Sequence, residues 1–128
     1  MSEHRDVVTA DGAPAAVGPY SHAVAHGGLV FCSGQVPLDP ATGKLVEGSL
    51  GEQTSRCLDN LSVVCAAAGT TLASAVRCGI YVTDIATFKE VNEAYGAYFP
   101  EAPPARTLIG VASLPLGAEV EIDAIVAA

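Results

Sequence analysis

The chain has 128 residues, half of them apolar, with a net charge of −8 and a mean hydropathy of +0.39. Its six basic residues are scattered singly rather than gathered in a basic stripe, which argues against nucleic acid or an anionic membrane surface as a partner. No run approaches the ~20 apolar residues of a membrane span, and the charged start lacks a signal peptide's apolar segment, so we expect one cytoplasmic domain over residues 1–128.

The first half of the chain predicts three short strands and then a helix. Residues 6–9 favour a strand, 13–20 a loop, and 22–25 with 29–33 a hairpin around a Gly-Gly turn. Consecutive turn residues fill 36–48. Ser49 and Glu52 then match a capping box, which predicts a helix that ends at Gly69. Its apolar face is formed by Leu58, Leu61, Val64, Cys65 and Ala68.

The second half predicts a strand, a second helix and two final strands. Alternating apolar residues favour a strand over 76–82. Asp84 is a typical helix cap, and Pro100 stops the helix that follows. Strands at 106–112 and 119–126 are joined by a turn at 114–117. The inner face of the second helix is predicted to consist of Phe88, Val91, Tyr95 and Phe99.

The order β-β-β-α-β-α-β-β predicts an α+β fold, with one mixed, mostly antiparallel sheet and both helices on one face. The excess of apolar residues then suggests that the other face is covered within an oligomer. The cysteines have neither C-x-x-C spacing nor a histidine at metal-ligand spacing, so we interpret them as reduced core residues and expect no metal. They are Cys32, Cys57, Cys65 and Cys78.

Arg106 is the most informative single residue, because a guanidinium at the start of an apolar run requires an anionic partner. Alternation places Glu119, Glu121 and Asp123 on one face of the last strand. The larger Ile109 and Val111 suit the core, which would place Arg106 on the open face with these acids. Three interpretations stay open: a solvated acidic face, a structural ion pair, or a pocket where Arg106 holds an anion and Glu121 moves a proton.

Four blocks in order carry a resemblance to a known family, with a fifth match at Val91-Asn92-Glu93-Ala94-Tyr95. Over about residues 13–125 the chain resembles the RidA/YjgF family of reactive-intermediate deaminases, also called endoribonuclease L-PSP. The resemblance implies a chorismate-mutase-like fold in a homotrimeric barrel, with sites in clefts between subunits. The four blocks are Gly18-Pro19-Tyr20-Ser21, Cys32-Ser33-Gly34-Gln35-Val36-Pro37, Pro104-Ala105-Arg106-Thr107 and Val120-Glu121-Ile122-Asp123-Ala124.

The resemblance also implies a reaction without metal or organic cofactor. The family hydrolyses 2-iminoacids, or enamines such as 2-aminoacrylate, to 2-ketoacids and ammonia. By this likeness Arg106 would clamp the substrate carboxylate, and Glu121 would hold the water and pass protons. Tyr20 would close the pocket. The remaining matching positions, which would line or support the site, are Ser33, Gly34 and Asn92.

Each of these residues also has an ordinary structural interpretation. Tyr20 suits a packed loop aromatic, Ser33-Gly34 a bend at a strand end, and Asn92 a support for a neighbouring loop. His22 is expected to cap or pack rather than to act as a base. Leu108 stands where many family members have cysteine, which predicts a more apolar pocket that accepts bulkier iminoacids.

Three rival functions fit the same sequence. The first is a specialised catabolic deaminase of the aminomuconate or aminoacrylate type. The second is a sensor that binds 2-ketoacids in the same cleft without turnover. The third is an endoribonuclease, which the acidic charge makes the weakest choice.

Overall fold

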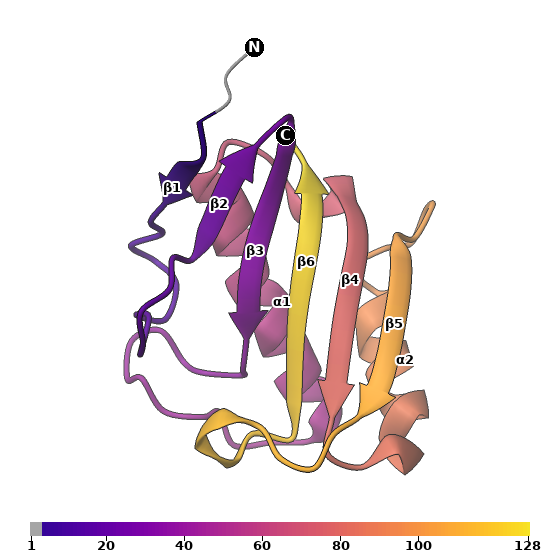
Figure 1. The fold of residues 1–128 in the computed structure, drawn as a ribbon. Coiled ribbons are helices and arrows are strands. Elements are labelled where there is room, and N and C mark those ends of the chain that lie inside the picture. Colours follow the sequence, from indigo (N-terminus) through magenta and orange to yellow (C-terminus); the bar gives the residue numbers. More distant parts are fainter. Residues whose placement is uncertain (1–3) are drawn as a thin grey trace.

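The computed structural model describes residues 4–128, so the first three residues of the charged start lie outside it. Six strands form one sheet in the order β1-β2-β3-β6-β4-β5, with neighbours antiparallel except for the parallel pair β4–β5. Both helices lie behind one face (Figure 1), which confirms the predicted α+β layout. The strands are β1 (Asp6–Val8), β2 (Ala23–His26), β3 (Leu29–Gln35), β4 (Ala75–Val82), β5 (Ala105–Gly110) and β6 (Val120–Ala127).

Helix α1 (Leu50–Ala67) provides most of the covering layer. It begins with the predicted capping box, in which the Ser49 hydroxyl accepts from the Glu52 amide and the Glu52 carboxylate accepts from the Ser49 amide. Leu58, Leu61 and Val64 are fully buried. The core therefore lies between α1 and the central strands, and the opposite face of the sheet stays open. Neither helix of residues 4–128 is long and apolar enough to cross a membrane.

Helix α2 (Phe88–Gly96) begins later than the sequence predicts. Asp84 caps a 3-10 turn, Ile85–Thr87, by accepting a hydrogen bond from the Ala86 amide. This turn leaves Phe88 44% exposed, so its predicted place on the inner face is wrong. The other three predicted residues of that face are buried, namely Val91, Tyr95 and Phe99.

The pairing of β5 contradicts the predicted face for Arg106. In the parallel ladder Arg106 lies beside Cys78 and Leu108 beside Ile80, and both β4 residues are fully buried under the helices. Residues paired across neighbouring strands share a face, so Arg106 and Leu108 point to the helix side. Ile109 is 44% exposed on the open face. The prediction failed because β5 is an edge strand, where the larger side chains need not face the core.

The four cysteines are buried thiols, in agreement with the core interpretation. Cys32 on β3 and Cys78 on β4 both pair with Ala124 of β6, so they flank its small side chain on the helix-covered face. Cys57 and Cys65 lie on the buried face of α1. Burial raises the pKa of Cys57 and Cys78, which keeps these two thiols protonated at neutral pH.

Candidate active site

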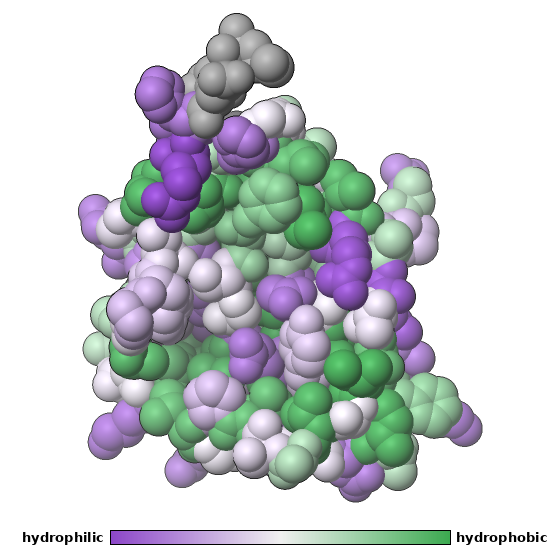
Figure 2. All heavy atoms as spheres, viewed as in Figure 1, coloured by the Kyte–Doolittle hydropathy of each residue, from purple (hydrophilic) through white to green (hydrophobic). Residues whose placement is uncertain are grey.

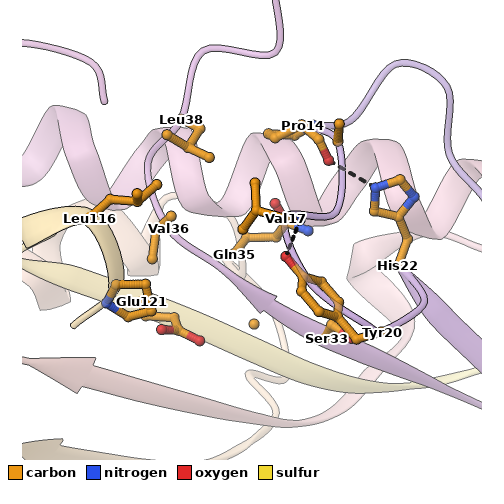
Figure 3. Close-up of a pocket in the computed structure, with 13 residues that line it drawn as sticks. Pro14, Val17, Tyr20, His22, Ser33, Gln35, Val36, Leu38, Leu116 and Glu121 are labelled. Carbon is orange, nitrogen blue, oxygen red and sulfur yellow. Dashed lines mark hydrogen bonds between the residues drawn. The ribbon is translucent and has the colours of Figure 1, made fainter. Parts of the chain in front are cut away.

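A cavity of about 310 Å³ opens between the loop before β2, the end of β3 and the turn before β6. Figure 3 shows Glu121 facing this cavity from β6, with Tyr20 and Ser33 on the other side. Most of the wall is apolar, which suits a small organic ligand held by a few polar groups. The apolar wall residues include Pro14, Val17, Val36, Leu38 and Leu116.

The Glu121 carboxylate lies directly over the backbone of Gly34. A methyl group at Gly34 would overlap this carboxylate, so only glycine leaves the space it occupies. The space coincides with a bulge in β3. Cys32 pairs with Ala124 and Gln35 with Ile122, so β3 advances by three residues where β6 advances by two. Gly34 is therefore more than part of a bend at a strand end, since it leaves room for the acidic group.

The environment of Glu121 makes ionisation of its carboxyl group less favourable than in water. The side chain is partly buried, and burial, followed by the negative charge of Asp123, raises its pKa above the usual range for glutamate. A carboxyl group with a raised pKa both accepts and returns protons more readily near neutral pH. Glu121 is accordingly the best candidate in this cavity for a general base and acid.

The Asp123 carboxylate is held in place by hydrogen bonds from the protein. Its two oxygens accept hydrogen bonds from the Gly79 amide at 3.0 Å and the Tyr81 hydroxyl at 2.9 Å. Glu119 departs from the predicted face, because it precedes β6 and its carboxylate accepts from the Gln53 side chain of α1 at 3.2 Å. The acidic face therefore reduces to Glu121 with Asp123 beside it.

Asp123→Asn is expected to move the acid limb of the pH–rate profile to lower pH. The neutral amide removes a negative neighbour that raises the pKa of Glu121, so Glu121 stays ionised to lower pH. A pH profile of kcat/KM for wild type and variant measures this shift. An unchanged limb would show that a group other than Glu121 sets it.

The hydroxyl groups of Tyr20 and Ser33 each form one hydrogen bond with the backbone. The Tyr20 hydroxyl accepts from the Val17 amide at 3.3 Å, which leaves its own proton for a ligand. The Ser33 hydroxyl donates to the Ser21 carbonyl at 2.6 Å. Tyr20 is therefore suited to donate to a ligand oxygen, whereas Ser33 offers only its oxygen lone pairs.

His22 holds the loop that carries Tyr20. Its Nδ1 accepts from the Ala10 amide at 3.0 Å, so Nε2 carries the proton and donates to the Pro14 carbonyl at 2.8 Å. The ring is buried, and both nitrogens are occupied. His22 therefore packs, as expected, and its two hydrogen bonds tie the loop to residues 10 and 14.

Arg106 lies outside the cavity of Glu121. It lines a second hollow of about 350 Å³ beside α2, and its guanidinium carbon is 5.1 Å from the centre of the Tyr95 ring. Asn92 lines the same hollow, and within residues 4–128 its buried side-chain oxygen has no hydrogen-bond partner. Leu108 packs against the core next to this hollow and is absent from the wall of the first cavity.

The expected site residues thus form two groups on opposite faces of the sheet. The open face carries Glu121, Gly34, Ser33 and Tyr20. The helix side carries Arg106, Asn92 and Leu108. The prediction that Arg106 shares a face with Glu121 is wrong for a single chain. Across residues 4–128, no three side chains of His, Cys, Asp or Glu come together as a metal site.

Sequence reasoning missed the apolar wall of the first cavity. Val17 and Leu116 are 71% and 59% exposed, although both are large apolar side chains in loops. Val36 and Leu38 belong to the segment 36–48, for which the sequence predicts only consecutive turns. The available signal was the placement of these apolar residues among Pro and Gly, where polar residues are usual.

Comparisons with known proteins agree with this fold. The model of the family described as Endoribonuclease L-PSP matches residues 10–128. The chain is 50% identical over 123 residues to Protein DfrA of Myxococcus xanthus, covering 94% of each. It is 43% identical over 121 residues to a mouse protein named 2-iminobutanoate/2-iminopropanoate deaminase, covering 94% of this chain and 90% of that one. The crystal structure of RidA from an Antarctic Psychrobacter superposes with a TM-score of 0.92 at 40% identity, covering 96% and 99%.

Proposed function

This chain belongs to the RidA/YjgF family, and on that premise we propose that it hydrolyses 2-iminoacids and their enamine tautomers to 2-ketoacids and ammonia. The observation that carries the proposal is Glu121, a carboxyl group with a raised pKa, seated over Gly34 in a small and mostly apolar cavity. The proposed class is a 2-iminobutanoate/2-iminopropanoate deaminase, a hydrolase that acts on a C=N bond.

In the proposed mechanism Glu121 relays two protons, one after the other, from oxygen to nitrogen. The carboxylate accepts a proton from water as the water oxygen bonds to the imine carbon and the C=N π electrons move to nitrogen. The carboxylic acid then returns this proton to nitrogen, which gives a carbinolamine. Glu121 next accepts the proton of the carbinol hydroxyl as the carbonyl forms, and passes it to nitrogen as the C–N bond breaks, which releases ammonia. A raised pKa supports both steps, since the same group must be base and acid in turn.

Arg106 is proposed as the anchor for the substrate carboxylate, supplied by a second copy of the chain. Its side chain and Glu121 point to opposite faces of one sheet, so a single chain does not bring them together. The open face also carries a row of apolar side chains, Val24, Phe31 and Ile125, paired across three strands. Figure 2 shows hydrophobic surface over the upper part of this face. We propose that copies associate through it as a homotrimer with sites between subunits.

A coupled assay tests the proposed reaction. An amino-acid oxidase generates 2-iminoacids in the presence of semicarbazide, and hydrolysis by the protein lowers the semicarbazone signal. We expect wild type to suppress the signal and Glu121→Gln to suppress it at least 100-fold less efficiently, because an amide cannot accept the proton from water. Equal suppression by both would remove Glu121 from the mechanism.

The rival functions predict different patterns of binding and turnover. Tight binding of a 2-ketoacid without any turnover would favour the sensor. Turnover confined to one unusual enamine would favour a specialised deaminase. RNA cleavage is not proposed, because the net charge is −8 and the cavity carries Glu121 with Asp123 beside it, a setting that repels phosphate.

A further inference from the structure

Leu116 has an unfavourable conformation at the rim of the Glu121 cavity. Its backbone is left-handed, with φ of 62° and ψ of 14°, a region that glycine and asparagine enter far more easily than leucine. The side chain is 59% exposed, so burial in the core of its own chain does not compensate for this conformation. Both the left-handed backbone and the exposure of an apolar side chain to water disfavour leucine at this position. Its side chain is therefore expected to contact a molecule outside its own chain.

The surroundings of Leu116 point to a ligand in the cavity. Leu116, Val36 and Leu38 line the same wall (Figure 3). Val17 lines the cavity as well and is 71% exposed in the loop that carries Tyr20. This surface begins beside the Glu121 carboxylate and offers no charge to a ligand group lying on it.

The chemistry of a 2-iminoacid places its side chain toward this surface. Carbon 2 bears the imine nitrogen, the carboxylate and the side chain, and Glu121 must approach that carbon with water. The carboxylate requires a cationic group, and nitrogen requires the proton that Glu121 returns. The apolar wall is the part of the cavity left for the third substituent.

On the basis of the proposed function, we propose that Leu116, Val36 and Leu38 form the subsite for the substrate side chain, with Leu116 as the specificity-determining residue. The preferred substrates are then 2-iminoacids with long apolar side chains, such as the one formed from leucine, over the one formed from alanine. Leu108, which the sequence suggested for this role, packs against the core instead.

Leu116→Gly tests the proposal by removing the side chain and relieving the left-handed backbone. The semicarbazide assay would compare kcat/KM for the leucine- and alanine-derived iminoacids. We expect a preference of about tenfold for the leucine-derived substrate in wild type and less than about twofold in the variant. Ile85→Ala is the matched control, since Ile85 is a 51% exposed apolar residue that does not line the cavity. It should keep the wild-type ratio.

Three other results would overturn the proposal. If wild type is active and Leu116→Gly keeps the same ratio of kcat/KM between the two substrates, the proposed subsite is wrong. The proposed function would be unaffected by that result. A changed molar mass of the assembly in Leu116→Gly would assign the side chain to contact between copies. No hydrolysis of either substrate by wild type would remove the proposed function, and the subsite with it. Calorimetry with 4-methyl-2-oxopentanoate and pyruvate gives the same ratio for binding alone.

Discussion

Arg106→Ala is expected to lower kcat/KM for every 2-iminoacid by roughly 10²–10³-fold while the chain stays folded. The substrate carboxylate would lose two parallel hydrogen bonds from the guanidinium, and truncating one partner of a partly desolvated charge pair costs about 3–4 kcal/mol. Within its own chain Arg106 is exposed and contacts the Tyr95 ring, an interaction worth only about 0.5–1 kcal/mol. The semicarbazide assay and thermal unfolding measure the two effects separately.

Arg106→Lys provides the matched control for charge. An ammonium group preserves the positive charge but not the planar, two-pronged donor geometry, so activity should recover only partly. Full activity in Arg106→Lys would show that charge alone is needed. Full activity in Arg106→Ala would remove this residue from the site.

Mixing two inactive variants tests whether one site draws on two copies. When Arg106→Ala and Glu121→Gln chains are unfolded together and refolded as a random mixture, about a quarter of the sites would combine an intact arginine with an intact glutamate from a neighbouring copy. Activity should therefore return to about a quarter of wild type. If both residues served one site within a chain, every site would lack one of them, and the mixture would stay inactive.

The elements were predictable where periodicity and caps were strong. The helix capped by Ser49 followed from a capping box and one apolar face, and the structure confirms both. The start of the second helix was harder, because Asp84 caps a 3-10 turn first and Phe88 then points to solvent. A cap in the sequence shows where a helical turn begins, but not whether that turn is α-helical.

The face of an edge strand could not be predicted from side-chain size. Ile109 is large and apolar, yet it lies on the open face, opposite Arg106 and Leu108. The register of a parallel neighbour decides the face, and register depends on how the chain crosses from β4 to β5 through α2. The separation of Arg106 from Glu121 therefore became visible only in three dimensions.

The space that Gly34 leaves for the Glu121 carboxylate could not be predicted from the sequence either. Ser33-Gly34 is compatible with a strand end, and only the pairing with β6 reveals a bulge opposite Glu121. The motif identified the residues, whereas the structure supplies the steric reason for a glycine there.

Gly34→Ala is expected to reduce kcat by about 100-fold without unfolding the chain. The added methyl group would occupy the space of the Glu121 carboxylate, and a flexible side chain moves more easily than the backbone. A displacement of about 1 Å in a catalytic group costs on the order of 10²-fold in rate. Gly51→Ala is the matched control, because a methyl group there would meet no atom closer than 3.5 Å.

A double variant shows whether the loss of kcat in Gly34→Ala results from displacement of Glu121. If Gly34→Ala acts only by displacing the carboxylate, adding it to Glu121→Gln should lower the rate little further, since two changes that disable one group are not additive. A further loss of about 100-fold in the double variant would mean that Gly34 acts independently, through its backbone or the shape of the cavity. The bulge would then contact the substrate itself rather than seat the acid.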